Sequence, residues 1–334
     1  MKLIFLIFII PLLFTACEKL LIEEDPLNTP VNNFELLWET IDKKYSFFTY
    51  KNINWDSLYH EYRPKVNDRM TKRQLFNLLS ELLFYLEDGH VNLESDFDRS
   101  GNWEWYKNSP KNFNYSLLRS SYLKDDFENI GPFVIQEIDS IGYIYLGSFS
   151  DRISTEDIDI IIKKFYNLKG IVFDVRSNGG GYSTNVAIIV RRFADRRRLV
   201  AHNKFKTGPG HDDFTDPRPV YISPSGKRQF LKPVAVLSNR RSYSAANDFV
   251  LNMSAFPNVT VVGDSTGGGG GTPVNAELLN GWTYRFSTTM TLAPDEFNVE
   301  EGIPPDIQVN MKQSDINSGI DTILETALEH IRNQ

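Results

Sequence analysis

The chain has 334 residues, of which 41% are hydrophobic, 13% aromatic and 24% charged. This is the balance of a globular protein, and at roughly 150 residues per domain the length predicts about two domains. Disordered, collagen-like and coiled-coil chains are excluded. The formal net charge of −7 argues against a nucleic-acid partner, because binding to phosphates requires an excess of Lys and Arg.

The N-terminus has the pattern of an export signal. Lys2 precedes an apolar run, residues 3–14, which is shorter than a membrane span and is interrupted by Pro11. The only cysteine, Cys17, follows Thr15-Ala16, and Phe-Thr-Ala-Cys resembles a bacterial lipobox. The resemblance implies a signal peptide over residues 1–16 and a lipid on Cys17. That lipid would hold the protein in the cell envelope, in the periplasm or at the surface. The alternatives are an ordinary signal peptide and a buried N-terminal helix.

A polar tether and a small helical domain are expected next. Residues 17–32 are polar and contain two prolines, which is typical of a solvated linker. Between residues 33 and 95, apolar residues recur at a spacing of three to four, which predicts three helices. The second helix begins near Asn54 and the third follows Thr71, both common N-cap residues. The pattern ends sharply at Glu87-Asp88-Gly89-His90.

The remainder alternates between strand and helix patterns. Residues 96–130 show no clear period and are expected to be a connecting segment, whereas residues 131–334 predict an α/β core with a largely buried sheet. The expected strands are 141–146, 170–174, 234–237 and 259–262, and the expected helices are 158–165, 183–194, 245–253 and 315–331.

Two segments lie where a predicted strand leads into a helix. Asp174 to Gly181 ends in three glycines, whose amides can approach an anion or an oxyanion; a plain glycine-rich connection is the simpler interpretation. Ser244 stands where the helix of residues 245–253 begins, a position suited to a nucleophile. Taken alone, Ser244 is better explained as a helix cap.

Histidines and the second glycine run were also considered. His90 and His211 are the two histidines in loop positions, and a lone histidine is more often structural than a general base. Residues 263–271 begin like a phosphate-binding loop, but Gly269 stands where the lysine is needed, which argues against a nucleotide site. No sequence pattern requires a metal or another cofactor.

The order and spacing of these segments resemble the tricorn-type branch of the C-terminal processing peptidases, which are serine proteases with a crotonase/ClpP-like α/β fold. The resemblance covers nearly the whole chain after the signal. It rests on residues 34–38, 54–56, 86–90, 174–181, 242–246, 262–267 and 302–307.

The resemblance implies roles for individual residues. Ser244 would be the nucleophile, His90 the general base, and the amides of Ala245 and Gly180 the oxyanion hole. One branch of the family uses a lysine about 25 residues after the serine, where this chain has Gly269. His90 is therefore the expected base.

The family also has a glutamate that orients the histidine, three residues before the glycine of a Gly-x-x-Pro-Asp motif. Val299 stands at that position here, followed by Glu300 and Glu301. In an extended segment side chains alternate, so Glu301 would share a face with position 299 and is the expected orienting group. The space between residues 90 and 141 is too short for an inserted peptide-binding module of the kind many relatives carry.

Three functions follow, in decreasing order of preference. The first is a lipid-anchored serine peptidase that cleaves peptides or unfolded segments through an acyl-enzyme, without a cofactor. The second is a catalytically inactive lipoprotein of the same fold that binds a peptide or an apolar ligand. The third is a metal-dependent site at His211, Asp212 and Asp213. Cleavage specificity and oligomeric state stay open.

Overall fold

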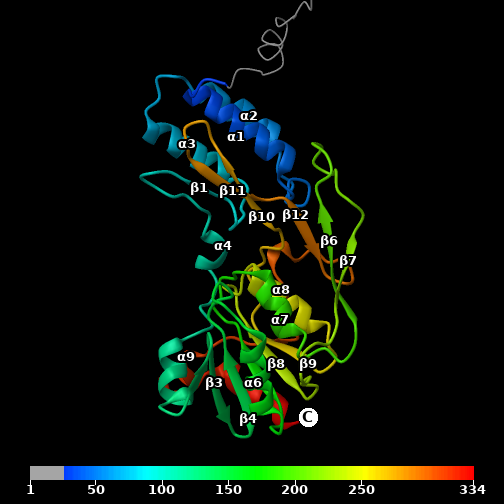
Figure 1. Ribbon diagram of the computed structural model, residues 1–334. Helices are drawn as coiled ribbons and strands as arrows, with labels where there is room; N and C mark the ends of the chain where they lie inside the picture. Colours follow the sequence, from blue (N-terminus) through cyan, green and yellow to red (C-terminus); the bar gives the residue numbers. More distant parts are fainter. Residues whose placement is uncertain (1–25) are drawn as a thin grey trace, which may run out of the picture.

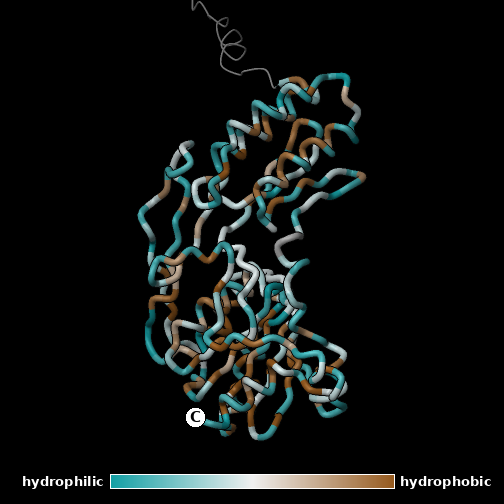
Figure 2. The backbone as a smooth tube through the Cα atoms, turned by 180° about the vertical axis from the view of Figure 1, so that it is seen from behind, coloured by the Kyte–Doolittle hydropathy of each residue, from teal (hydrophilic) through white to brown (hydrophobic). Residues whose placement is uncertain are grey.

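The computed structural model describes residues 26–334 and contains three sheets together with helices on both sides of the largest one (Figure 1). Figure 1 places the N-terminal helices at one end and the seven-stranded sheet at the other, with α7 and α8 between them. Figure 2 shows apolar residues concentrated in two places, inside the body around the large sheet and among the N-terminal helices. Among the helices of residues 26–334, none has both the length and the apolar composition that a membrane span requires.

Three capped helices form the N-terminal unit. They are α1 (Pro30–Lys44), α2 (Trp55–Tyr62) and α3 (Lys72–Phe84). The predicted caps Asn54 and Thr71 both accept a backbone N–H with their side chains. The first helix begins earlier than expected, because Thr29 caps it and Pro30 is favoured at the first helical position.

A segment from far along the chain completes this unit. β1 (Asn92–Glu94), β11 (Thr283–Ser287) and β10 (Pro273–Glu277) form an antiparallel sheet in the order β1-β11-β10. Trp282, Tyr284 and Phe286 are buried with the helices in one apolar cluster. The helical unit therefore includes residues that the sequence pattern assigned to the α/β core.

The seven-stranded sheet has the order β13-β9-β8-β5-β4-β3-β2. Its members are β2 (Glu128–Ile130), β3 (Phe133–Ile138), β4 (Ile141–Tyr145), β5 (Ile171–Asp174), β8 (Val234–Ser238), β9 (Val259–Gly263) and β13 (Ile307–Gln308). The neighbouring strands β4, β5, β8, β9 and β13 pair parallel. At the other edge β3 pairs antiparallel with both β4 and β2. The four predicted strands are confirmed.

Helices cover both faces of this sheet. α6 (Thr155–Phe165), α7 (Ser183–Val190) and α8 (Ala245–Ser254) pack on one face and α10 (Thr322–Arg332) on the other. Alternation along β5 shows both layers, because Phe173 belongs to the first cluster and Val172 to the second. Burial on both faces explains why these strands read as continuous apolar runs.

The predicted C-terminal helix of residues 315–331 is two helices, α9 (Gln313–Asn317) and α10. Gly319, with φ of +78°, ends the first, and the Asp321 carboxylate starts the second by accepting the amides of Ile323 and Leu324. The spacing of apolar residues continues across both helices, so the sequence pattern does not reveal the break.

The remaining elements connect these layers. The segment of residues 96–130 contains α4 (Glu104–Lys107), α5 (Tyr115–Leu118) and a π-helical turn, Arg119–Leu123. An arm of three antiparallel strands, in the order β12-β6-β7, rises beside α8 toward the helical unit (Figure 1). Its strands are β6 (Arg198–Phe205), β7 (Arg218–Ile222) and β12 (Thr289–Leu292).

Candidate active site

Ser244 occupies a strained turn between β8 and α8. Its backbone has φ of 57° and ψ of −120°, a region that residues other than glycine rarely adopt. Its amide donates to the carbonyl of Gly268 at 2.9 Å, which helps to fix the turn. Ser244 is the N-cap residue of α8, yet its side chain makes no capping hydrogen bond. A sharp, strained turn between a strand and a helix is also the position from which α/β-hydrolases expose their nucleophilic hydroxyl.

His90 reaches Ser244 from the helical unit. The His90 Nε2 and Ser244 Oγ atoms are 3.0 Å apart, which is hydrogen-bonding distance. The imidazole is buried, and its centroid lies 4.9 Å from that of the Tyr243 ring. Two residues that are 154 positions apart in the chain therefore meet as a hydroxyl–imidazole pair.

The surroundings keep His90 neutral. Burial lowers the pKa of His90 to about 4, the nearby Asp88 carboxylate opposes that shift, and Arg285 and Lys51 add to it. A neutral imidazole that accepts the Ser244 proton at Nε2 carries its own proton at Nδ1. Among residues 26–334, no hydrogen-bond partner stands at His90 Nδ1.

Asp88 lies beneath the histidine turn as a buried carboxylate. One of its oxygens accepts the His90 amide at 2.7 Å, and the other accepts the hydroxyls of Tyr45 and Ser287, each at 3.2 Å. These bonds join the end of the helical unit to β11. Asp88 is therefore the carboxylate that fixes the backbone of His90 and faces the imidazole with a negative charge.

The structure does not bring Glu301 to His90, contrary to the prediction. Residues Val299–Glu301 form a 3₁₀ turn, so the strand alternation on which the prediction relied is absent. Glu301 is exposed, and its carbonyl oxygen accepts a hydrogen bond from Arg240.

Glu300 is the buried member of the pair. Its carboxylate contacts Lys51 Nζ at 3.0 Å and accepts the amide of Gly270 at 2.9 Å. Burial, followed by the neighbouring charge of Asp88, raises the pKa of Glu300 to about 8, and Lys51 opposes this shift. Glu300 thus forms a buried charge cluster with Lys51 and Asp88, and it makes no hydrogen bond to the ring nitrogens of His90.

The two expected oxyanion donors, the amides of Ala245 and Gly180, lie beside Ser244 and differ in their hydrogen bonding. Ala245 is the first residue of α8, where amides have no intrahelical acceptor. Gly180 has φ of +99°, and a Cβ there would lie 3.0 Å from the Ala245 nitrogen and 2.8 Å from Ser244 Cβ. The Gly180 amide donates to Asn178 Oδ1 at 2.9 Å in this structure. A substrate oxygen held by Gly180 must therefore share that donor or displace Asn178.

The second glycine run allows two loops to pass very close together. A Cβ on Gly268, which has φ of +87°, would lie 1.8 Å from the carbonyl oxygen of Glu300. Its own carbonyl accepts the Ser244 amide. Gly268 therefore links the serine turn to the turn that carries Glu300.

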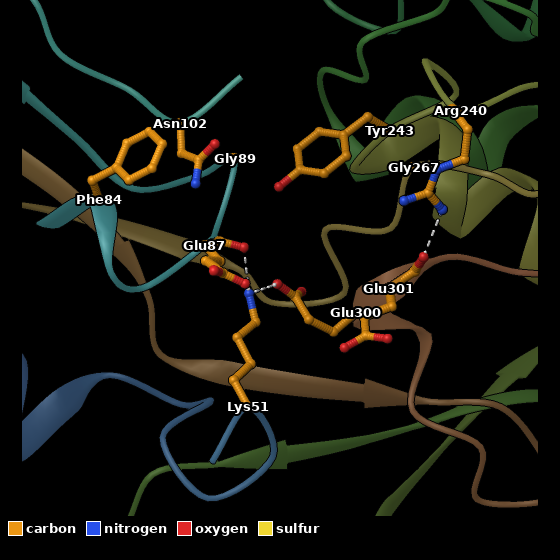
Figure 3. A pocket seen from close by; sticks show the side chains of 10 residues that line it. All are labelled: Lys51, Phe84, Glu87, Gly89, Asn102, Arg240, Tyr243, Gly267, Glu300 and Glu301. Atoms are coloured by element: carbon orange, nitrogen blue, oxygen red, sulfur yellow. Dashed lines mark hydrogen bonds and ion pairs between the residues drawn. The ribbon is translucent and has the colours of Figure 1, made fainter. Parts of the chain in front are cut away.

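A cavity of about 640 Å³ opens between the serine turn and the helical unit (Figure 3). It is lined by Gly89 and Tyr243, the chain neighbours of His90 and Ser244, and by Gly267 of the second glycine run. In Figure 3 the Lys51 ammonium, paired with Glu300, lies below the cavity, and Phe84 and Asn102 lie together on the side away from Arg240. Ser244 and His90 do not line the cavity themselves, but it lies against their chain neighbours Tyr243 and Gly89.

The other proposed sites are arranged differently. His211 Nε2 lies 2.9 Å from Asp42 Oδ1, and its ring packs 4.4 Å from that of Phe48. The Asp213 carboxylate accepts the amide of Gly210 within its own loop. Over residues 26–334, no three His, Cys, Asp or Glu side chains are placed to hold a metal ion together. Cys17 lies outside the described residues.

Sequence reasoning missed Asp88, Tyr243 and Lys51. Asp88 could have been found, because a carboxylate two residues before a candidate base lies within reach of the same turn. The pairings of Lys51 with Glu300 and of Asp88 with Ser287 join distant segments, and no local pattern carries them.

Comparison with known proteins places this chain and its fold in a family of serine peptidases. Residues 140–309, about half of the chain, match Peptidase family S41, and residues 28–84 match the Tricorn protease C1 domain. The chain belongs to peptidase family S41. Its core is thus the tricorn-like α/β fold that the motifs predicted, preceded by a small helical region.

Similar proteins include one of high structural likeness and several distant ones. A candidate peptidase from Parabacteroides merdae ATCC 43184 has a TM-score of 0.87 and 43% identity, over 91% of this chain and 97% of that one. Mature CPAF complexed with lactacystin has a TM-score of 0.72 at 11% identity, over 92% and 99% of the chains, which shows the fold alone. The carboxy-terminal processing protease CtpA of Bacillus subtilis (strain 168) is 26% identical over 176 residues, 52% of this chain. The match spans only 35% of that relative.

Proposed function

We propose that this protein is a serine peptidase that hydrolyses peptide bonds through an acyl-enzyme on Ser244, with His90 as the general base. The observation that carries the proposal is the 3.0 Å contact between His90 Nε2 and Ser244 Oγ at a strained strand-to-helix turn. Helix capping, the competing explanation for Ser244, is not supported, because its side chain makes no capping bond.

The reaction proceeds in two halves. Ser244 Oγ attacks the scissile carbonyl carbon while His90 Nε2 takes the hydroxyl proton, and the carbonyl oxygen becomes an oxyanion beside the Ala245 amide. Collapse of this intermediate breaks the C–N bond, and imidazolium returns the proton to the leaving amine. Water then attacks the ester with the same base, which releases the acid product and restores Ser244.

In this proposal Asp88, and not Glu301, is the carboxylate that positions His90. It holds the His90 backbone rather than the ring, and its charge favours imidazolium, the form that His90 adopts during the reaction. In this proposal Asp88 is a positioning residue.

The second candidate function, an inactive binding protein of the same fold, has two observations in its favour. His90 Nδ1 has no hydrogen-bond partner within residues 26–334, and the Gly180 amide is engaged by Asn178. A site that closes fully around a peptide would reverse the second of these.

The experiment that separates the two candidates is labelling with a serine-directed fluorophosphonate, followed by mass mapping of the adduct. We expect an adduct on Ser244 in the wild type that is lost in both Ser244→Ala and His90→Ala. Ser254→Ala, at the other end of α8, is the matched control, because its hydroxyl donates only to a local carbonyl, that of Leu251. A folded wild type that does not react favours the binding protein.

For location, we propose that a diacylglycerol on Cys17 anchors the peptidase at a membrane of the cell envelope, with peptides or unfolded proteins as substrates. The support is the resemblance of residues 14–17 to a lipobox. Incorporation of labelled palmitate that is lost in Cys17→Ser is the expected result. Label retained in that variant would contradict the assignment.

A further inference from the structure

A second cleft adjoins the cavity at the catalytic pair. It has a volume of about 580 Å³ and lies at the end of α3, against the segment that follows β1. Phe84, Tyr85 and Trp103 stand at its rim as exposed aromatic side chains, and the buried Leu83 and Val91 line it from within. We call this the aromatic cleft.

The aromatic cleft and the active-site cavity are neighbours. Phe84 and Asn102 line both, so the two spaces share these side chains as part of their walls. In Figure 3 the two residues lie together on the wall of the cavity away from Arg240. A polypeptide that occupies the cavity beside Tyr243 therefore lies next to the aromatic cleft.

The size of the cavity sets the spacing. A space of about 640 Å³ is on the order of 10 Å across, which roughly three residues of extended peptide span. The side chain that reaches the cleft would thus lie roughly three residues from the scissile bond. Binding of an apolar side chain there is favourable, because both that side chain and the exposed aromatic rings of the cleft are removed from water.

We propose that the aromatic cleft binds an aromatic or large aliphatic side chain of the substrate, so that the preferred substrates are polypeptide segments with such a residue near the cut. This inference rests on the proposed peptidase function and adds a substrate class to it. Segments of this kind are buried in folded proteins, so the site would select unfolded chains over native ones.

The test measures kcat/KM on short peptides that share one sequence and carry Phe, Leu or Ser at positions roughly two to five residues on either side of the cut. We expect the wild type to prefer Phe over Ser at one position by about tenfold or more. Phe84→Ala and Trp103→Ala should each reduce this preference to near parity, and Phe84→Leu should keep part of it.

Phe297→Ala is the matched control. Phe297 has the same exposed fraction as Phe84, 48%, and lies at a different pocket, so its loss should leave the preference unchanged. Thermal unfolding of each variant confirms that it is folded. A wild type indifferent to the substituted residue, or a preference that survives both Phe84→Ala and Trp103→Ala, overturns the inference.

Binding separates this inference from the proposed function. Fluorescein-labelled Phe and Ser peptides are titrated against Ser244→Ala, with and without Phe84→Ala. If the wild type cleaves nothing but the Phe peptide binds more tightly in a Phe84-dependent way, the peptidase assignment fails and the aromatic cleft stands. Equal binding of both peptides, or a dimer that dissociates in Phe84→Ala, means that no substrate side chain fills the cleft.

Discussion

The helical unit and the α/β core are built differently, and the Ser244–His90 pair takes one member from each region. The core is assembled from neighbouring strand–helix segments and supplies Ser244 on the turn after β8. The helical unit is completed by β10 and β11, which return from residues 273–287, and it supplies His90 at its edge. Ser244 therefore stands on a strand-to-helix turn inside the core, held also by the Gly268 carbonyl, whereas His90 stands at an edge that a returning segment completes.

The largest effect is expected for Ser244, the member of the pair that the core supplies. Ser244→Ala should lower peptide hydrolysis by at least about a thousandfold, because the residual rate of such variants comes only from binding and the oxyanion donors. The measurement is kcat/KM on any cleaved peptide, with Ser254→Ala as control. Activity within tenfold of the wild type would remove Ser244 from the mechanism.

The next effect compares the stability of the two regions. Trp282→Ala should reduce the free energy of unfolding by about 3–5 kcal/mol, because its buried ring packs edge-on against Phe76 and Phe97. Phe249→Ala, which empties a space beside Phe173 in the core, should cost a similar amount.

Hydrogen exchange distinguishes these two variants. Trp282→Ala should speed exchange in α1, α3 and β1 first and should leave β5 and β8 protected. Uniform acceleration over both regions would show that they open as one cooperative unit, and the contrast drawn between them would fail.

A smaller effect concerns the histidine turn. Asp88→Asn should lower kcat/KM by about tenfold to a hundredfold, because a charge that favours imidazolium is lost while the buried hydrogen bonds are largely kept. In the wild type the acid limb of kcat/KM should lie near the His90 pKa of about 4, since His90 must be neutral to act as a base.

The sign of the change in the pH profile is fixed by the structure. Asp88 raises the pKa of His90, so its neutralisation lowers that pKa and moves the acid limb to lower pH. A purely structural role would reduce the rate without moving the limb. A limb that moves to higher pH would contradict the assignment of Asp88.

The smallest effect is expected at the exposed carboxylate. Glu301→Gln should stay within about twofold of the wild-type kcat/KM, because exposed charges contribute little through water. A loss comparable to that of Asp88→Asn would restore Glu301 as the group that orients His90 and would mean that the 3₁₀ turn rearranges when substrate binds.

The sequence allowed the core to be predicted where local rules decide. The four buried strands and the caps Asn54 and Thr71 followed from apolar runs and side-chain chemistry. The break at Gly319 was missed, because the apolar period of the two C-terminal helices continues across it. The Ser244–His90 pair was expected only through family resemblance, since no local pattern joins residues 154 positions apart.

The misjudged carboxylate has a physical explanation. Alternation of side chains holds for a strand, and residues 299–301 instead turn tightly enough to expose Glu301 and bury Glu300. Nothing in the local composition distinguishes these two conformations. The turn is held by contacts with the second glycine run, such as the Gly269 amide on the Glu300 carbonyl.

The return of β11 to the helical unit orders events while the protein is being made. Synthesis proceeds from the N-terminus, so the serine and the histidine both emerge before the strand that carries Ser287. Until that strand pairs with β1, Asp88 lacks one of its partners and the histidine turn is not fixed. A nascent chain therefore carries Ser244 and His90 before the strand that completes the contacts of Asp88 has been made.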